Sequence, residues 1–260
     1  MAEGFIEPHL FAGFSGGRKS ILPGIAGKKT IIYNHSAEML DHSCTRAGQL
    51  KNNIVHEDMK AAAQEVGLSF ILNVALDDEK NIIGAFAGNE EKAFLQGAAF
   101  VEKLTGFSCH KAEIVVTGNG GYPLDQNLYQ AVKSICTAEY AVKENGVIIV
   151  AASCLDGIGG DNFYNILAQN MSPAESLAQI RSLPPTDTSL DQWQAHILLR
   201  ALTKCKIIIV TEGIDGEILD SMGLKKATTL EAALEMAYKE LGEAVQVLVI
   251  SNGAGVCGST

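Results

Sequence analysis

The side chains best suited to chemistry lie near the start of the chain, where two histidines flank a lysine in a glycine-rich segment. His9 follows a Glu-Pro pair, Lys19 lies in the run Ser-Gly-Gly-Arg-Lys-Ser, and His35 follows an apolar segment. A lysine held in such a loop is either a phosphate contact or a nucleophilic amine. The histidines offer a metal ligand, a proton carrier or both. This segment is therefore the first candidate for a functional site.

Two simpler interpretations of the lysine segment stay open. The run could be a solvated turn that exposes the cations Arg18 and Lys19. It could also be a phosphate-binding loop of a nucleoside triphosphatase, which requires Gly-x-x-x-x-Gly-Lys followed by Ser or Thr. Arg18 stands where that motif needs its second glycine, so the sequence departs from the pattern.

Composition limits the class of protein. The chain has 260 residues, of which 47% are hydrophobic and 19% charged, enough to bury a substantial core. A formal net charge of −10 argues against nucleic acid and anionic membranes as partners, because both need a basic surface. The six cysteines form no Cys-x-x-Cys pair, and no secretory signal opens the chain. These features favour a protein of the reducing cytoplasm.

The alternation of apolar strands with amphipathic helices predicts an α/β fold, in which helices flank a mainly parallel sheet in a three-layer sandwich. Residues 30–33 are predicted to form a short buried strand that delivers His35 to a strand's carboxyl end, where α/β proteins place their sites. The other predicted strands are 70–76 and 81–87, paired as a hairpin, and 113–117, 146–152, 206–210 and 245–250. The main predicted helices are 53–67, 90–104, 124–144 and 229–241.

A second candidate stretch follows the predicted strand 113–117 and reads GNGGYPLDQNLYQAVKS. On the helix predicted after it, Gln126, Gln130 and Lys133 would lie near one another. A polar face exposed to solvent explains the same spacing. Another glycine-rich loop follows the strand 146–152, so we expect loops at several strand ends to line one pocket.

The run His56-Glu57-Asp58 near the start of the helix 53–67 admits two interpretations. It could contribute to a metal cluster. Acidic residues in the first turn are more simply explained by their favourable interaction with the helix dipole. We therefore predict a structural role for this run.

Two stretches together carry a resemblance to a known family. The segment IEPHLFAGFSGGRKSILPG with its later Asn-His pair, followed by GNGGYPLDQNLYQAVKS, resembles the nickel-pincer lactate racemases, the nickel-dependent 2-hydroxyacid racemases and epimerases. The resemblance implies that Lys19 carries a pyridinium-3,5-dithiocarboxylic acid mononucleotide through a thioamide bond. It also implies that this nucleotide holds nickel, that His35 completes the metal's coordination, and that His9 is a general acid/base.

The resemblance assigns further residues to the site. Gln130 and Lys133 would contact the 2-hydroxyacid, and a cation near its carboxylate or a developing oxyanion makes physical sense. Trp193, the only tryptophan, would pack against the cofactor, although a single tryptophan is most often a core residue. The other residues assigned to cofactor binding are Ser15, Gly16, Gly17 and Arg18.

The resemblance also predicts the domain organisation. Residues 1–260 would form a single α/β domain similar to the family's C-terminal domain, without the N-terminal domain that supplies a second acid/base histidine and an arginine for the substrate carboxylate. That domain and the enzymes that make the cofactor would be partners. Two alternatives stay open: a cofactor-binding half that needs a separate N-terminal domain, and a zinc hydrolase using His9 and His35. The latter lacks an obvious third ligand.

Overall fold

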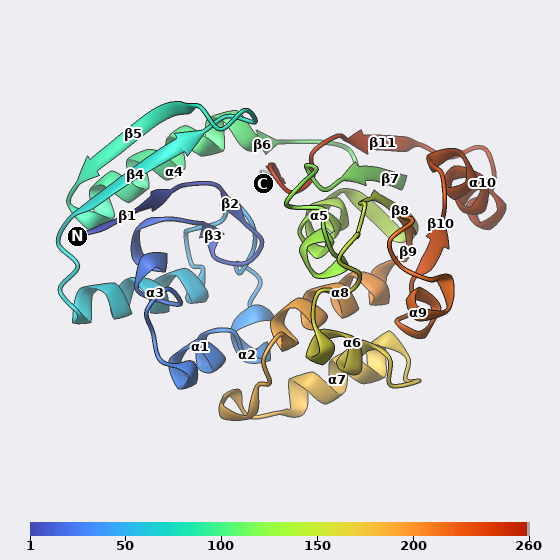
Figure 1. Ribbon diagram of the computed structural model, residues 1–260, viewed down its shortest axis with the longest axis horizontal. Coiled ribbons are helices and arrows are strands. Elements are labelled where there is room, and N and C mark those ends of the chain that lie inside the picture. The colour runs from blue at the N-terminus through green and yellow to red at the C-terminus, as the bar shows by residue number, and fades with distance from the viewer. Residues whose placement is uncertain (259–260) are drawn as a thin grey trace. The chain divides into compact units, whose positions relative to one another are not determined.

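The computed structural model describes residues 1–258, which divide into two compact units (Figure 1). Unit 1 contains Met1–Ser108, Pro184–Thr188 and the described residues from Gly255 onward, and unit 2 contains Cys109–Leu183 and Ser189–Ala254. This differs from the one compact unit expected from the sequence. The physical reason is that each unit has its own sheet and its own hydrophobic cluster.

Unit 2 is built on a five-stranded parallel sheet with the strand order β10-β9-β8-β7-β11. Four consecutive residues of β8, Val147 to Val150, are at most 1% exposed, so both faces of the sheet are covered. The sheet confirms the predicted α/β fold. Its strands are β7 (Ala112–Gly118), β8 (Val142–Ala151), β9 (Lys206–Val210), β10 (Lys225–Ala227) and β11 (Val247–Ile250).

Helices pack on the two faces of this sheet (Figure 1). On one face Ala233 and Ala237 of α10 contact a cluster that includes Ile149 and Ile208. Alternation along β8 turns Ile148 to the opposite face, where α5 and α8 pack against each other and against the sheet. The helices of unit 2 are α5 (Leu128–Ala141), α6 (Asp161–Leu167), α7 (Pro173–Ser182), α8 (Gln192–Lys204), α9 (Gly216–Ser221) and α10 (Leu230–Leu241).

Helix α5 begins four residues later than predicted. The Asn127 side chain accepts a hydrogen bond from the Gln130 N–H at 3.0 Å and so caps the helix. Asp125, which lies before the helix, accepts a hydrogen bond from the Ser153 N–H at 3.3 Å. Gln126 therefore lies outside the helix and does not share a helical face with Lys133.

A partly buried ion pair joins α5 to α8. Arg200 Nη2 lies 2.7 Å from Glu139 Oε2, and the two side chains are 27% and 14% exposed. We expect Glu139→Ala to lower the free energy of unfolding by about 3 kcal/mol, because it leaves a desolvated guanidinium without its carboxylate. Glu240→Ala, which breaks the exposed pair with Lys206, should cost less than about 1 kcal/mol in the same urea titration. Equal losses in the two variants would contradict this prediction.

Unit 1 contains a three-stranded sheet with the order β1-β4-β5. Strands β4 (Ile71–Leu76) and β5 (Ile82–Gly88) form the predicted antiparallel hairpin, and β1 (Ala2–Phe5), which the sequence did not reveal, pairs parallel to β4. Helix α4 (Glu90–Thr105) covers one face of this sheet and contributes Phe94 and Val101 to the core. The other elements are β2 (Pro8–His9), β3 (Gly13–Phe14), η1 (Gly17–Ser20), α1 (Lys28–Asn34), α2 (Ala37–Leu40), α3 (Ile54–Glu65), β6 (Gly106–Phe107), η2 (Pro185–Asp187) and β12 (Cys257–Gly258).

The strand predicted for residues 30–33 is wrong, because these residues belong to helix α1. A short β-branched run fits a strand or a buried helix equally well, and tertiary contacts decide between them. Here the Asn34 side chain donates to Asp58 Oδ2 of α3 at 2.7 Å and fixes the end of the helix. His35 is consequently the C-cap of α1 and does not follow a strand.

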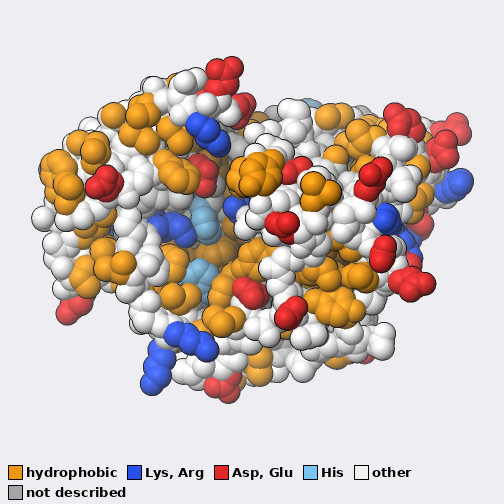
Figure 2. Space-filling model, in the orientation of Figure 1, with side chains coloured by type: hydrophobic (Ala, Val, Ile, Leu, Met, Phe, Trp, Pro, Cys, Tyr) orange, Lys and Arg blue, Asp and Glu red, His pale blue; other side chains and the backbone are white. Residues whose placement is uncertain are grey.

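On the face shown in Figure 2, acidic side chains lie at many separate places. This distribution agrees with the net charge of −10. Within residues 1–258, no helix is both long and apolar enough to cross a membrane.

Candidate functional site

The structure brings His9 and Lys19 into contact. Lys19 Nζ lies 3.2 Å from His9 Nε2, and the N–H of Ala12 donates to His9 Nδ1 at 3.2 Å. His9 ends β2, and Lys19 lies in the short helix η1. The antiparallel pairing of β2 with β3 folds the chain back, so that residues ten apart in sequence meet. Two of the predicted site residues therefore form one hydrogen-bonded pair.

His35 is the third predicted residue of this site. It is 5% exposed, and burial, assisted by the positive charge of Lys19, lowers the pKa of His35 to about 4. The buried Phe11 ring lies edge-on to both histidines, with centroid distances of 4.6 Å to His9 and 5.0 Å to His35. At neutral pH His35 is therefore an uncharged imidazole, which is the state that binds a metal ion.

Helix α3 holds all three segments that carry these residues. Asn53 at its N-cap donates to the Phe11 carbonyl at 2.8 Å, and His56 accepts from Arg18, the neighbour of Lys19. Asp58 accepts from Asn34, the neighbour of His35. The His56-Glu57-Asp58 run thus has structural contacts: His56 and Asp58 accept hydrogen bonds from the residues next to Lys19 and His35, and Glu57 lies in the first turn of the helix.

The glycines before Lys19 allow close packing against the protein itself. Gly16 and Gly17 have φ values of 80° and 55°, which favour glycine. A Cβ on Gly16 would lie 2.9 Å from Ile6, and one on Gly17 would lie 3.0 Å from Phe94. The Gly17 N–H also donates to the buried Asn73 side chain at 2.8 Å. The two glycines are therefore required to seat this loop on the core of unit 1.

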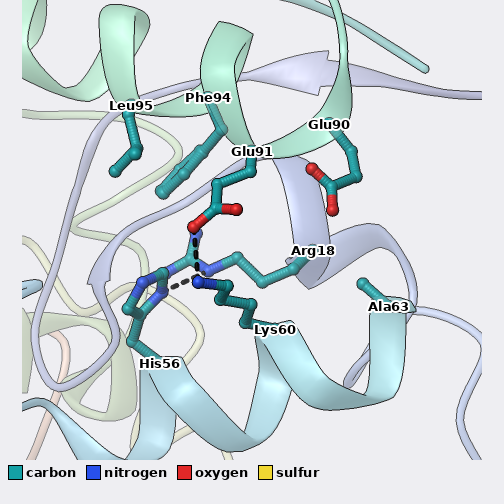
Figure 3. Close-up of a pocket in the computed structure, with 8 residues that line it drawn as sticks. All are labelled: Arg18, His56, Lys60, Ala63, Glu90, Glu91, Phe94 and Leu95. Atoms are coloured by element: carbon teal, nitrogen blue, oxygen red, sulfur yellow. Dashed lines mark hydrogen bonds and ion pairs between the residues drawn. The ribbon is translucent and has the colours of Figure 1, made fainter. Parts of the chain in front are cut away.

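Ser15 and Arg18, both assigned to cofactor binding from the sequence, have side chains that bond within unit 1. Ser15 Oγ donates to the Phe5 carbonyl at 3.1 Å. The Arg18 guanidinium is directed between α3 and α4, where its Cζ lies 4.2 Å from the centroid of the Phe94 ring (Figure 3). The pocket there holds about 20 Å³, roughly the space of one water molecule. It is lined by Arg18, His56, Lys60, Ala63, Glu90, Glu91, Phe94 and Leu95.

His56 should make the stability of the protein sensitive to acid. Burial, followed by the charges of Arg18 and Lys60, lowers the pKa of His56 to about 4. Glu90 and Glu91 of α4 also line this pocket. Between about pH 6.5 and 4 the unfolded chain takes up a proton at His56 and the folded chain does not, so stability falls as the pH falls. At pH 5 the loss should be about 2 kcal/mol.

We therefore expect His56→Gln to lose about 2 kcal/mol less stability than the parent chain between pH 7 and pH 5. Urea unfolding followed by circular dichroism at both pH values measures the difference. His110→Gln, at an exposed histidine, should retain the parent's pH dependence. A His56→Gln chain with the parent's pH dependence would contradict the prediction.

Gln130, Lys133 and Trp193 belong to unit 2. Gln130 and Lys133 lie on α5, each with a half-buried side chain. Trp193 is also half-buried, and its Nε1–H donates to the Tyr129 hydroxyl at 2.9 Å. Burial, followed by the nearby Asp191 carboxylate, raises the pKa of Tyr129 to about 12. Tyr129 therefore stays an uncharged phenol, and its hydroxyl oxygen accepts the hydrogen bond from the Trp193 indole. This role of Tyr129 was not identified from the sequence.

An open hollow in unit 2 lies at the carboxyl ends of β8, β9 and β10. The predicted convergence of strand-end loops is found there, since the loops after all three strands line it. Its lining residues are Asp125, Ala151, Ala152, Ser153, Val210, Thr211, Glu212 and Thr228.

Within residues 1–258, no group of three or more His, Cys, Asp or Glu side chains could hold a metal ion. His35 is nevertheless a suitable single ligand, because its imidazole is buried and uncharged. The lysine amine near it and the fixed loop between them fit a bound group that brings its own donor atoms to the metal. The donor set of unit 1 is therefore compatible with a nickel-pincer nucleotide.

Two domains of one protein family match this chain. Residues 107–257 match the lactate racemase C-terminal domain, and residues 1–48 match the lactate racemase N-terminal domain. The chain belongs to the lactate racemase family. The N-terminal match contains His9, Lys19 and His35, which differs from the expectation that the whole chain resembles the C-terminal domain.

Individual members of the lactate racemase family are also similar to this chain. It is 47% identical to the lactate racemase of Lactiplantibacillus plantarum and 46% identical to that of Thermoanaerobacterium thermosaccharolyticum, over 98% of this chain and 60% of each relative. The lactate racemase apoprotein structure from the latter organism matches with a TM-score of 0.97 and 45% identity, over 99% of this chain and 62% of that one. The chain thus spans about 60% of the length of these curated relatives.

A structure with much lower sequence identity shares only the fold with this chain. A protein from Thermotoga maritima matches with a TM-score of 0.71 and 16% identity, over 99% of this chain and 65% of that chain. The fold of this lactate racemase family member therefore persists where little sequence identity remains.

Proposed function

We propose that this chain takes part in racemising or epimerising a lactate-like 2-hydroxyacid, with His9, Lys19 and His35 at the reacting centre. The observation that carries the proposal is the contact between Lys19 Nζ and His9 Nε2 beside a buried, uncharged His35. Membership of the lactate racemase family supports it. Inversion by hydride transfer removes the hydroxyl proton and a hydride to give a planar 2-ketoacid, and then returns hydride to the opposite face of the carbon and the proton to the oxygen.

Each residue has a role that follows from its chemistry. The Lys19 amine anchors the cofactor covalently, the uncharged His35 imidazole is the protein's ligand to nickel, and His9 takes up and returns the hydroxyl proton. When bound, the nickel-pincer nucleotide supplies the hydride acceptor. From unit 2, we assign Gln130 and Lys133 to substrate contacts and Trp193 to cofactor packing.

A second candidate is a cofactor-binding half that acts only with a separate polypeptide. The fact that favours it is length, since the chain covers 60% of its curated relatives. In this form the partner supplies the second acid/base histidine and the group that binds the substrate carboxylate. Activity of the 260-residue chain alone would exclude this candidate.

The experiment is intact-mass spectrometry combined with nickel analysis and an assay of D- and L-lactate interconversion. The chain is produced with the enzymes that make the pincer nucleotide. We expect one added nucleotide on Lys19 and one nickel ion per chain, and we expect the nickel to be lost in His35→Ala. His110→Ala, at an exposed histidine, is the matched control and should retain the metal.

The outcomes separate the candidates. Loading together with lactate racemisation establishes the first candidate. Loading without racemisation, followed by activity when a family N-terminal domain is added, establishes the second. A chain that acquires neither nucleotide nor nickel, even with that domain present, would overturn both. Zinc without a modified lysine would favour a hydrolase instead.

A further inference from the structure

Arg18 carries a buried charge that the proposed chemistry does not use. The residue is 5% exposed, and its guanidinium donates to three uncharged acceptors: His56 Nδ1 at 2.9 Å, the Gly16 carbonyl at 3.1 Å and the Ala12 carbonyl at 2.7 Å. The Phe94 ring faces it as well. A buried cation is costly, and an apolar side chain would fill the same space more favourably. The arrangement therefore calls for a specific role.

The acceptors of Arg18 show what it fixes. Two of them are carbonyls of the loop that connects His9 to Lys19, and the third belongs to α3, the helix that also holds the Phe11 and Asn34 segments. The planar guanidinium therefore holds the loop against helix α3 in a fixed orientation. A lysine ammonium has no such planar fork and cannot reproduce these directions.

One residue, Ala12, connects Arg18 to the reacting pair. The Ala12 carbonyl accepts from Arg18 Nη2, while the Ala12 N–H donates to His9 Nδ1. The other ring nitrogen of His9 faces Lys19, the residue that follows Arg18. In η1 successive side chains point about 120° apart, so an inward Arg18 turns Lys19 toward a different side.

From this closed chain of contacts we propose that Arg18 is a positioning residue, which sets the ring orientation of His9 and the direction of Lys19 through Ala12 and helix η1. The direct cofactor contact that the resemblance implied for Arg18 stays a prediction. The inference rests on the proposed function only in taking the His9–Lys19 pair to be important for the reaction. The orientation of the two side chains can be measured in the chain without the cofactor.

The test compares Arg18→Lys and Arg18→Met with the parent 260-residue chain. Trace labelling of amines between pH 7 and pH 10, quantified by peptide mass spectrometry, gives the reactivity of Lys19 relative to the exposed Lys28 and Lys29. Nitrogen NMR of the histidine rings reports which nitrogen of His9 carries the proton. Arg46→Met, at an exposed arginine of unit 1, is the matched control.

Losing charge-assisted hydrogen bonds should reduce the positioned conformer about tenfold. We expect the labelling rate of Lys19 to rise by about that factor toward the rate of Lys28 in both Arg18 variants. The pH profile of labelling should shift with it, and His9 should change from one tautomer to a mixture. Arg46→Met should leave all three readouts unchanged.

Parent-like labelling and a parent-like His9 tautomer in Arg18→Lys would overturn the proposal, because charge alone would then suffice. Circular dichroism monitors folding, and if Arg18→Met does not fold, Arg18→Lys carries the test alone. A chain that never acquires the nucleotide but shows the Arg18 effect would overturn the proposed function and support this inference.

Discussion

The Lys19→Arg chain should have the mass of its unmodified sequence when it is produced with the cofactor-making enzymes, whereas the parent chain gains one nucleotide. The reason is chemical, since a guanidinium that stays protonated above pH 12 is not the nucleophile that a lysine amine can become. Arginine keeps the charge and roughly the length, so an effect of charge alone is excluded. We expect complete loss of the covalent adduct and, with it, of lactate racemisation.

The control for this result is Lys28→Arg, because Lys28 is an exposed lysine of the same unit. It should acquire the nucleotide in the parent's yield. Proteolysis followed by mass spectrometry locates the adduct. An adduct on the Lys19→Arg chain at any other residue would contradict the assignment of the anchor, and so would one on Lys28 in the parent chain.

The second large effect is expected for His9→Asn in the loaded enzyme. Asparagine keeps hydrogen-bonding atoms near Lys19 and the Ala12 N–H but cannot take up a proton, so the cost falls on proton transfer. General acid/base catalysis typically contributes 10²- to 10⁴-fold, and we expect a fall in kcat of about that size. KM should change little, because the loss concerns the transition state.

Loading separates this result from a structural failure. His9→Asn should still bind the nucleotide at Lys19 and nickel at His35, as measured by intact mass and metal analysis. His110→Asn is the control, because its histidine is exposed, and should keep the parent's rate. A His9→Asn chain that racemises lactate at the parent's rate would assign the proton transfer to another residue.

Much of the fold follows from local patterns that the sequence displays. Four of the five strands of the parallel sheet, β7, β8, β9 and β11, were predicted from apolar runs, which are typical of strands buried on both faces, whereas the short strand β10 was not predicted. The capping box at Ser172 and Glu175 is another feature that a short sequence pattern encodes, because both of its hydrogen bonds are local. The helix at residues 30–33 could not be predicted in this way, because its apolar residues fit a strand or a helix equally well. The hydrogen bond from Asn34 to Asp58 of α3, a contact between distant segments, fixes the end of the helix.

The candidate site, too, was predictable from the sequence only in part. The residue types and the glycine-rich loop identified His9, Lys19 and His35 as chemically capable, and the family resemblance implied their roles. The contacts that arrange them join residues far apart in sequence, such as Arg18 to His56 and Gly17 to Asn73. Asn73 stands as a lone polar residue within the apolar strand β4, which was the one available signal.

The sequence by itself determined the α/β class, the family and the residues able to do chemistry, because these depend on composition, periodicity and short motifs. Only the tertiary structure decided that the chain forms two units, that His35 ends a helix, and that Arg18 faces inward. The physical reason is that a side chain's direction and partners depend on which distant segments pack against it. No local pattern records that α3 supplies the acceptor for Arg18.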